Sequence, residues 1–124
     1  MKRDRGAAMI ELALILPILI MLLVGIISFG RAYSAQLSIA GSAREGARVL
    51  ALGGTYTAVD AAVNGTKGAA DVTLISKTPC PANSNGTSTA FATVVVHASF
   101  SFDIPFVPLG TRTFSASASM RCGL

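Results

Sequence analysis

The sequence predicts an α+β protein. A long N-terminal transmembrane helix continues into a small domain, and a three-stranded antiparallel sheet packs on that helix. Three observations carry this prediction: an apolar run from Met9 to Phe29, no helix-breaking pair before Gly53-Gly54, and two later segments in which apolar and polar residues alternate. The 124 residues suffice for one modest domain.

The apolar run has the length of a membrane span. Residues 9–29 read MIELALILPILIMLLVGIISF, and Glu11 carries the only charge between Ala7 and Gly30. A helix needs about 20 such residues to cross a hydrocarbon core. A buried core helix is the alternative, but a chain this short could hardly cover a helix that is apolar on every side. We therefore expect a transmembrane helix over residues 7–30.

The charges around this segment set its orientation. Lys2, Arg3 and Arg5 precede it, so the positive-inside rule keeps residues 1–6 in the cytoplasm as a basic leader. The rest of the chain then lies outside the cytoplasmic (inner) membrane, and the lipid bilayer is its first partner. A cleaved secretory signal is an alternative, with Ala32-Tyr33-Ser34 as a weak cleavage site. Its apolar stretch would have to be about 7–15 residues, which is shorter than the one here.

The helix continues beyond the membrane. No breaker interrupts the chain from Arg31 to Leu52, and Gly53-Gly54 is a suitable helix end. We predict one helix from about Ala7 to Leu52, roughly 70 Å long, with residues 31–54 as its extramembrane part. Pro17 should kink it, because its ring removes a backbone hydrogen bond.

Two faces of the extramembrane part have a helical period. One is an apolar stripe formed by Leu37, Ala40, Ala43, Ala47 and Leu50. The other is a row of small residues, Gly30, Ser34, Ser38, Ser42 and Gly46, here called the small-residue row. Small residues at this spacing let two helix backbones approach closely, which favours packing on a second helix. A weakly amphipathic helix over its own sheet, with the serines in water, is the other interpretation.

Residues 55–124 form the expected extracytoplasmic domain. Thr57–Val63 fits a short helix or a turn-rich connection. A first strand is expected at about Asp71–Lys77. The clearest strand follows, with one apolar face made of Ala92, Val94, Val96, Ala98, Phe100, Phe102 and Ile104. A third strand alternates in the same way from Thr113 to Met120.

Turn signals separate these strands. Pro105, Pro108 and Gly110 interrupt the chain between the second and third strands, which favours an antiparallel hairpin. Asn64-Gly65-Thr66 and Asn85-Gly86-Thr87 fit a glycosylation pattern, but Asn-Gly is first a turn signal, and both are predicted to be turns.

Cys80 and Cys122 are the only cysteines. An even number of cysteines in an exported domain suggests a disulfide. In a meander, the first and third strands end at the same edge of the sheet. Cys80 follows the first strand and Cys122 closes the third, so we predict that they pair. Two free thiols are the alternative.

The residues point away from enzymatic chemistry. His97 lies on the polar face of a strand without cysteine or carboxylate neighbours at ligand spacing, so it is predicted to be a surface residue rather than a metal ligand. No phosphate-binding loop or nucleophile motif is present, and we expect no catalytic residue, cofactor, metal or small-molecule substrate. The formal charge of +4 is scattered, without interleaved aromatics, which argues against nucleic acid.

The membrane entrance carries a recognisable pattern. Residues 5–11 read RGAAMIE, in which a glycine is followed by four residues, then glutamate and then the apolar run. This segment resembles the processing site of type IV prepilins. From Arg5 to Leu52 the chain resembles the TadE-like family of the tight-adherence (Flp-type) pilus assembly system. The further matching residues are Pro17, Gly25, Phe29-Gly30-Arg31 and the segment AREGAR at 43–48. The chain departs from the family pattern at Leu12 and Ser28.

The resemblance implies a pilin-like fold and a role in pilus assembly. A prepilin peptidase would cut after Gly6, leaving Ala7 as the new N-terminus and Glu11 as the fifth mature residue. Glu11 would then meet the freed amine of Ala7 during assembly, on its own or a neighbouring subunit. A plain interfacial position is the other interpretation of Glu11. The implied partners are the peptidase, other pilin-like (pseudopilin) subunits and the pilus membrane platform. A signal-anchored or secreted envelope protein that binds a surface partner is the alternative function.

Overall fold

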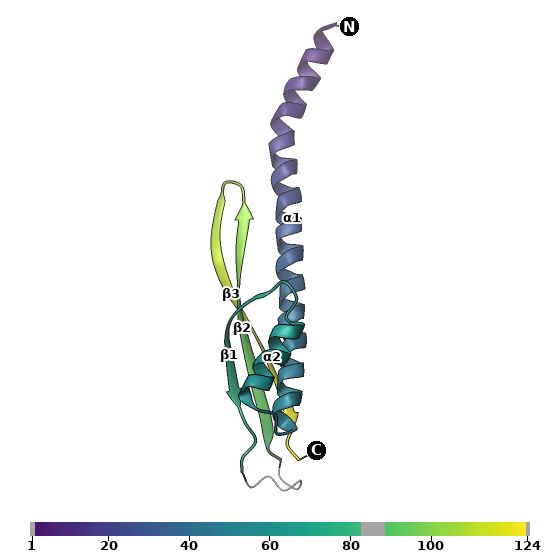
Figure 1. Cartoon of the computed structure of the whole chain (residues 1–124). Helices are drawn as coiled ribbons and strands as arrows, with labels where there is room; N and C mark the ends of the chain where they lie inside the picture. Colours follow the sequence, from purple (N-terminus) through teal and green to yellow (C-terminus); the bar gives the residue numbers. More distant parts are fainter. Residues whose placement is uncertain (1, 83–88, 124) are drawn as a thin grey trace.

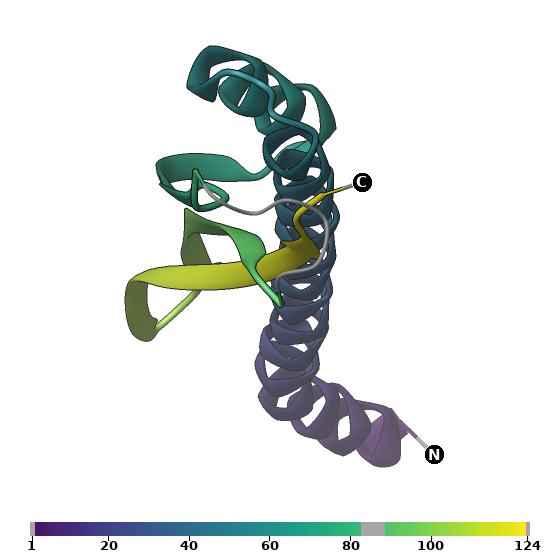
Figure 2. The ribbon, with the colours of Figure 1, turned by 90° about the horizontal axis from the view of Figure 1, so that it is seen from below.

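The fold is that of a long helix with a small domain on its C-terminal half. The computed structural model describes residues 2–82 and 89–123. The elements are α1 (Lys2–Ala51), α2 (Tyr56–Thr66), β1 (Asp71–Thr78), β2 (Phe91–Ile104) and β3 (Val107–Arg121). The strands form one antiparallel sheet in the order β1-β2-β3. The sheet and α2 flank the C-terminal half of α1, the β2–β3 hairpin reaches past the middle of the helix, and the N-terminal part extends beyond the hairpin (Figure 1, Figure 2). The predicted α+β fold is confirmed.

α1 is a single helix of 50 residues that begins at Lys2, earlier than the predicted start at Ala7. Pro17 lies inside it, and Figure 1 shows the helix bending within its N-terminal third. Its C-terminus is closed by the predicted glycine pair. The Gly53 N–H donates to the Leu50 carbonyl at 3.1 Å, and the Gly54 N–H donates to the Val49 carbonyl at 2.9 Å. With Gly53 at φ +81, this is a Schellman motif.

The choice left open for Thr57–Val63 is resolved, because this segment lies within the helix α2. The Thr55 hydroxyl accepts a hydrogen bond from the Ala58 N–H at 3.2 Å and caps the helix. The predicted turn at Asn64-Gly65-Thr66 is wrong, since these residues form the last turn of α2. The Thr66 hydroxyl bonds back to the Ala62 carbonyl at 2.8 Å, which suits a helix better than a turn. Asn85-Gly86-Thr87 lies outside the described residues.

The core lies where α1, α2 and the sheet meet. The predicted apolar face of β2 is confirmed, since its residues are buried from Ala92 to Ala98 and half-buried at Phe100, Phe102 and Ile104. The stripe on α1 is corrected: Leu37 is 57% exposed, whereas Ile39 is completely buried. The core-facing side of α1 therefore lies slightly around the helix from the predicted stripe. The fully buried positions with apolar side chains are Ile39, Ala43, Ala47, Val59, Val63, Ala92, Val94 and Val96.

The β2–β3 hairpin is longer than predicted. β3 begins at Val107, so Pro108 and Gly110 lie within the strand, and only Pro105-Phe106 connects β2 to β3. β3 is an edge strand, where a proline without an N–H group is tolerated. Gly110 has φ +65 and lies next to a register irregularity in the pairing with β2, which absorbs the extra residue.

A disulfide joins Cys80 to Cys122, which confirms the predicted pairing. Their Cα atoms are 5.8 Å apart. The Cys122 N–H donates to the Ala90 carbonyl at 2.9 Å, so the backbone after β3 is held to the start of β2. The bond therefore ties the end of β1 to the end of β3 across the bottom of the sheet.

Gly46 lies where α1 packs tightly on its own domain, and its replacement gives a first prediction. A Cβ atom there would lie 2.8 Å from Val63 of α2 and 3.3 Å from Val94 of β2. We expect Gly46→Leu to destabilise the domain by about 1–3 kcal/mol through overpacking. Gly41→Leu is the matched control, because a Cβ at Gly41 meets nothing within 4 Å. The control should gain up to about 1 kcal/mol from helix propensity.

The two variants are compared by thermal unfolding of the full chain in one detergent. The melting temperature of Gly46→Leu should fall, and that of Gly41→Leu should hold or rise. Equal melting temperatures for both would show that α2 and β2 do not pack on Gly46 as described.

Candidate functional site

The predicted processing residues lie on the free N-terminal part of α1. A Cβ added to Gly6 would meet nothing within 4 Å, so the backbone at this glycine is open on its side-chain face. Ala7 and Glu11 are exposed and one helical turn apart, on the same face of the helix. Among the side chains that the structure describes, no hydrogen bond or ion pair engages Glu11. The Glu11 carboxylate is thus available to a partner.

The apolar segment that follows is uncovered by the rest of the chain. None of the most apolar 18-residue window of α1 is buried, and Leu14 is 71% exposed. Large apolar side chains project around the whole circumference, among them Met9, Ile18, Leu22 and Ile26. A surface of this kind and length needs hydrocarbon around it, from lipid or from other apolar helices.

Four aromatic rings, here called the phenylalanine cluster, join the outer end of this segment to the hairpin. Phe29 of α1 lies against Phe102 of β2, with ring centroids 5.5 Å apart. Phe100 stands edge-on to Phe102 at 5.0 Å, and Phe114 of β3 lies within 6.5 Å of both. Such pairs are favourable beyond their buried area. They hold the hairpin beside α1 at the level where the apolar segment ends.

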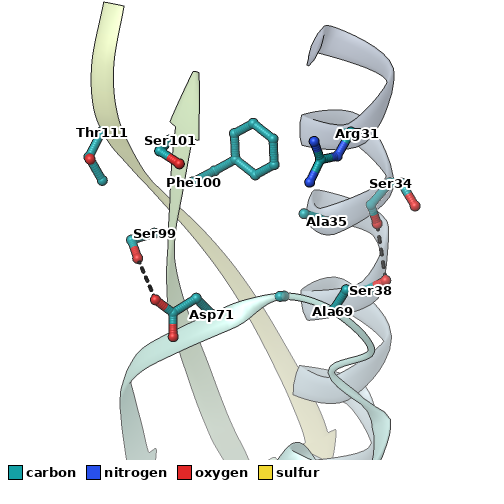
Figure 3. Close-up of a pocket in the computed structure, with 11 residues that line it drawn as sticks. Arg31, Ser34, Ala35, Ser38, Ala69, Asp71, Ser99, Phe100, Ser101 and Thr111 are labelled. Atoms are coloured by element: carbon teal, nitrogen blue, oxygen red, sulfur yellow. Dashed lines mark hydrogen bonds between the residues drawn. The ribbon is translucent and has the colours of Figure 1, made fainter. Parts of the chain in front are cut away.

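A polar pocket of about 500 Å³ opens just beyond the cluster, between α1 and the sheet (Figure 3). Arg31 and Phe100 extend into the space from opposite sides. The Ser99 hydroxyl donates to the Asp71 carboxylate at 3.2 Å, and the Ser38 hydroxyl donates to the Ser34 carbonyl at 3.0 Å. A cation and a carboxylate therefore line one pocket at the outer boundary of the apolar segment.

The small-residue row divides into two parts. Ser42 is completely buried and donates to the Ile39 carbonyl at 2.9 Å, and Gly46 contacts α2 and β2. This end of the row packs on the chain's own domain. A Cβ on Gly30 would meet nothing within 4 Å, and Ser34 is exposed beside the polar pocket. Ser38 stands between the two parts, 3.4 Å from the position of a Cβ on Gly68.

Two features were not foreseen from the sequence. The Lys77 ammonium contacts both carboxylate oxygens of Asp60, at 2.6 and 2.7 Å, and lies 5.6 Å from the centre of the Tyr56 ring. This bridge links β1 to α2, and no spacing rule pairs a strand with a helix.

The hairpin tip is the second feature, with Phe106 at φ +64 and 94% exposed. The apolar run IPFVPL at 104–109 is the sequence signal from which this exposed tip could have been predicted.

The fold and these surfaces define a class: a small α+β domain carried by one uncovered apolar N-terminal helix, compatible with single-pass membrane anchoring. Residues 6–48 match the family described as TadE-like protein. The resemblance is thereby confirmed for this segment, which is most of α1. Comparison with curated proteins and with solved structures yields no match.

Proposed function

We propose that this protein is a pilin-like subunit that acts in assembly of a tight-adherence (Flp-type) pilus. Residues 7–30 anchor it in the cytoplasmic membrane, residues 1–6 are a cytoplasmic leader, and the domain over 55–124 lies outside. A prepilin peptidase removes the leader after Gly6. The processed subunit then associates with other pilin-like subunits and with the membrane platform of the system.

One observation carries this proposal. The TadE-like match begins at Gly6, continues through the uncovered apolar segment and ends at Arg48, close to the end of α1. The matched segment thus includes the whole apolar part of α1 that its own domain leaves uncovered. An anchor that must leave lipid and enter an assembly needs such a surface, since other apolar helices can replace the lipid around it.

Glu11 supplies the electrostatic part of the proposal. Its carboxylate is exposed and lies one turn beyond Ala7. Cleavage after Gly6 creates a positively charged amine at Ala7, next to the positive end of the helix dipole. In an apolar setting the attraction between a carboxylate and this amine is far stronger than in water. The pair can therefore form within one subunit or align two neighbours.

Replacement of Glu11 tests this role. Glu11→Gln keeps the shape of the side chain and removes its charge. We expect the variant to be processed and to accumulate in the membrane, but to lose co-purification with pilin subunits by at least tenfold. Ten-fold corresponds to about 1.4 kcal/mol, less than a buried charge pair contributes when one partner is removed. The measurement is the amount of pilin recovered with the tagged chain.

Glu45→Gln is the matched control, because Glu45 is a glutamate of the same helix whose partner, Arg48, is an exposed neighbour at 3.9 Å. It should co-purify with pilin as the wild type does. Wild-type recovery with Glu11→Gln would mean that Glu11 only occupies the interface and takes no part in assembly.

A further inference from the structure

We infer that the tip of the β2–β3 hairpin, residues 104–109, is a second membrane-contacting element that enters the outer leaflet beside the transmembrane helix. The inference rests on the proposed membrane anchoring, and it adds a contact between the exported domain and lipid hydrocarbon.

At three heights along α1, the residues of the helix and the hairpin residues beside them have the same polarity. At the lowest level Arg31 and Ser34 share the polar pocket with Ser101 and Thr111. One step towards the N-terminus of α1, Phe29 packs on Phe102. Still further along, the hairpin tip stands next to the apolar segment itself (Figure 1). Polar residues face polar residues, aromatic faces aromatic, and apolar faces apolar.

At the third level the tip and the helix enclose an apolar notch of about 440 Å³. Every residue that lines it is apolar: Ala13, Leu16, Pro17, Ile18, Ile20, Met21, Pro105 and Phe106. One wall of the notch belongs to the middle of the transmembrane segment. If this segment is in lipid, the material that fills the notch is hydrocarbon, and the opposite wall, Pro105-Phe106, touches the same hydrocarbon.

The depth follows from helix geometry. Met21 precedes Phe29 by eight residues, so the tip reaches about 12 Å inside the outer end of the apolar segment. The hydrocarbon core is about 30 Å thick, which places the tip in the outer leaflet. The phenylalanine cluster fixes this height, because it attaches the hairpin to α1 just below.

The chemistry of the tip suits this environment. Residues 104–109 read IPFVPL, without a polar side chain, and the two prolines contribute no N–H group that lipid would leave unsatisfied. Ile104 pairs with Val107 across the hairpin. Phe106 is 94% exposed at φ +64, a position where a turn normally has glycine or asparagine. A bulky apolar side chain in this strained and exposed place is explained by a contact outside the chain.

The chain contains no tryptophan, which permits a direct test with three single-tryptophan variants of the full chain. Phe106→Trp reports on the tip. Leu19→Trp reports on the transmembrane segment at a residue outside the notch. Phe91→Trp, at the opposite end of β2 and 52% exposed, reports on a water-facing position. Each variant is reconstituted at low protein-to-lipid ratio in phosphatidylcholine vesicles with brominated acyl chains. Bromine quenches tryptophan fluorescence only on contact.

We expect bromine to quench Phe106→Trp and Leu19→Trp several-fold more than Phe91→Trp, and aqueous acrylamide to quench only Phe91→Trp strongly. If Leu19→Trp is quenched by bromine while Phe106→Trp responds to acrylamide, the helix is anchored and the inference about the tip is wrong. If Leu19→Trp also escapes bromine, the anchoring itself fails. If Phe106→Trp is shielded from both quenchers and loses this shielding on dilution, a second copy covers the tip and the lipid contact is refuted.

Discussion

Gly6→Val should leave the protein at its full precursor length in its host. A peptidase that cuts within the membrane plane needs close access to the backbone at the scissile bond, and glycine offers it because it has no Cβ. A Cβ at Gly6 meets nothing within 4 Å in the chain, so the valine does not disturb the fold. The effect would fall on processing alone. The measurement is the intact mass of the membrane-bound chain.

Gly25→Val is the matched control for this prediction. It makes the same substitution on the same helix, again in open space, far from the proposed cleavage site. Its mass should correspond to a chain that begins at Ala7. Normal cleavage of Gly6→Val at the same bond would mean that Gly6 is not the processing residue.

Removing the disulfide should have the largest effect on stability. The bond closes a loop with a sequence separation of 42, for which the chain-entropy model gives about 4 kcal/mol. Most small domains are stable by only roughly 5–15 kcal/mol, so the loss is a large part of the total. The double variant Cys80→Ala/Cys122→Ala avoids placing a polar hydroxyl at Cys122, which is 3% exposed. Its denaturant midpoint should fall accordingly.

The wild-type chain after reduction and alkylation is the internal comparison, and it should unfold near the midpoint of the double variant. Protein exported by its host should weigh two hydrogens less before reduction than after. Two freely alkylated thiols in that sample, or an unchanged midpoint for the double variant, would overturn the stabilising role of the bond.

The alternation of apolar and polar residues in strands, and glycines at a helix end, made much of this fold predictable. β2 alternates over its whole length, and because one face is buried the period of two fixes which residues face α1. Gly53-Gly54 signalled the end of α1, because only glycine adopts φ +81 without strain. The pairing of Cys80 with Cys122 followed from the even number of cysteines together with the strand order. Each of these signals is local, or depends only on the order of the strands.

The predictions that failed required knowledge of contacts between elements. Asn64-Gly65-Thr66 has the composition of a turn, but Val63 is buried against the core, and this burial extends α2 through the glycine. The hairpin was expected to start its second strand later, because Pro108 and Gly110 are breakers in a central strand. β3 is an edge strand, where both residues are tolerated, and the pairing of Ile104 with Val107 starts the strand before them.

The same distinction, between local sequence signals and contacts between elements, applies to the candidate site. Gly6, Ala7 and Glu11 were accessible to sequence reasoning because they form one contiguous motif at the start of an apolar run. The polar pocket around Arg31 and Asp71 joins residues forty positions apart, and only the packing of the sheet on α1 brings them together. The apolar notch likewise depends on the height at which the hairpin stands.

The mature N-terminus of the wild-type chain tests the central claim most directly. The membrane fraction of the native host is isolated, and the N-terminus of the protein is determined by mass spectrometry. For a processed, membrane-anchored, pilin-like subunit we expect a membrane-bound chain that begins at Ala7 and retains the whole apolar segment. A chain that begins after Ser34 and is found outside the membrane would contradict it, and would make this protein a secreted module instead.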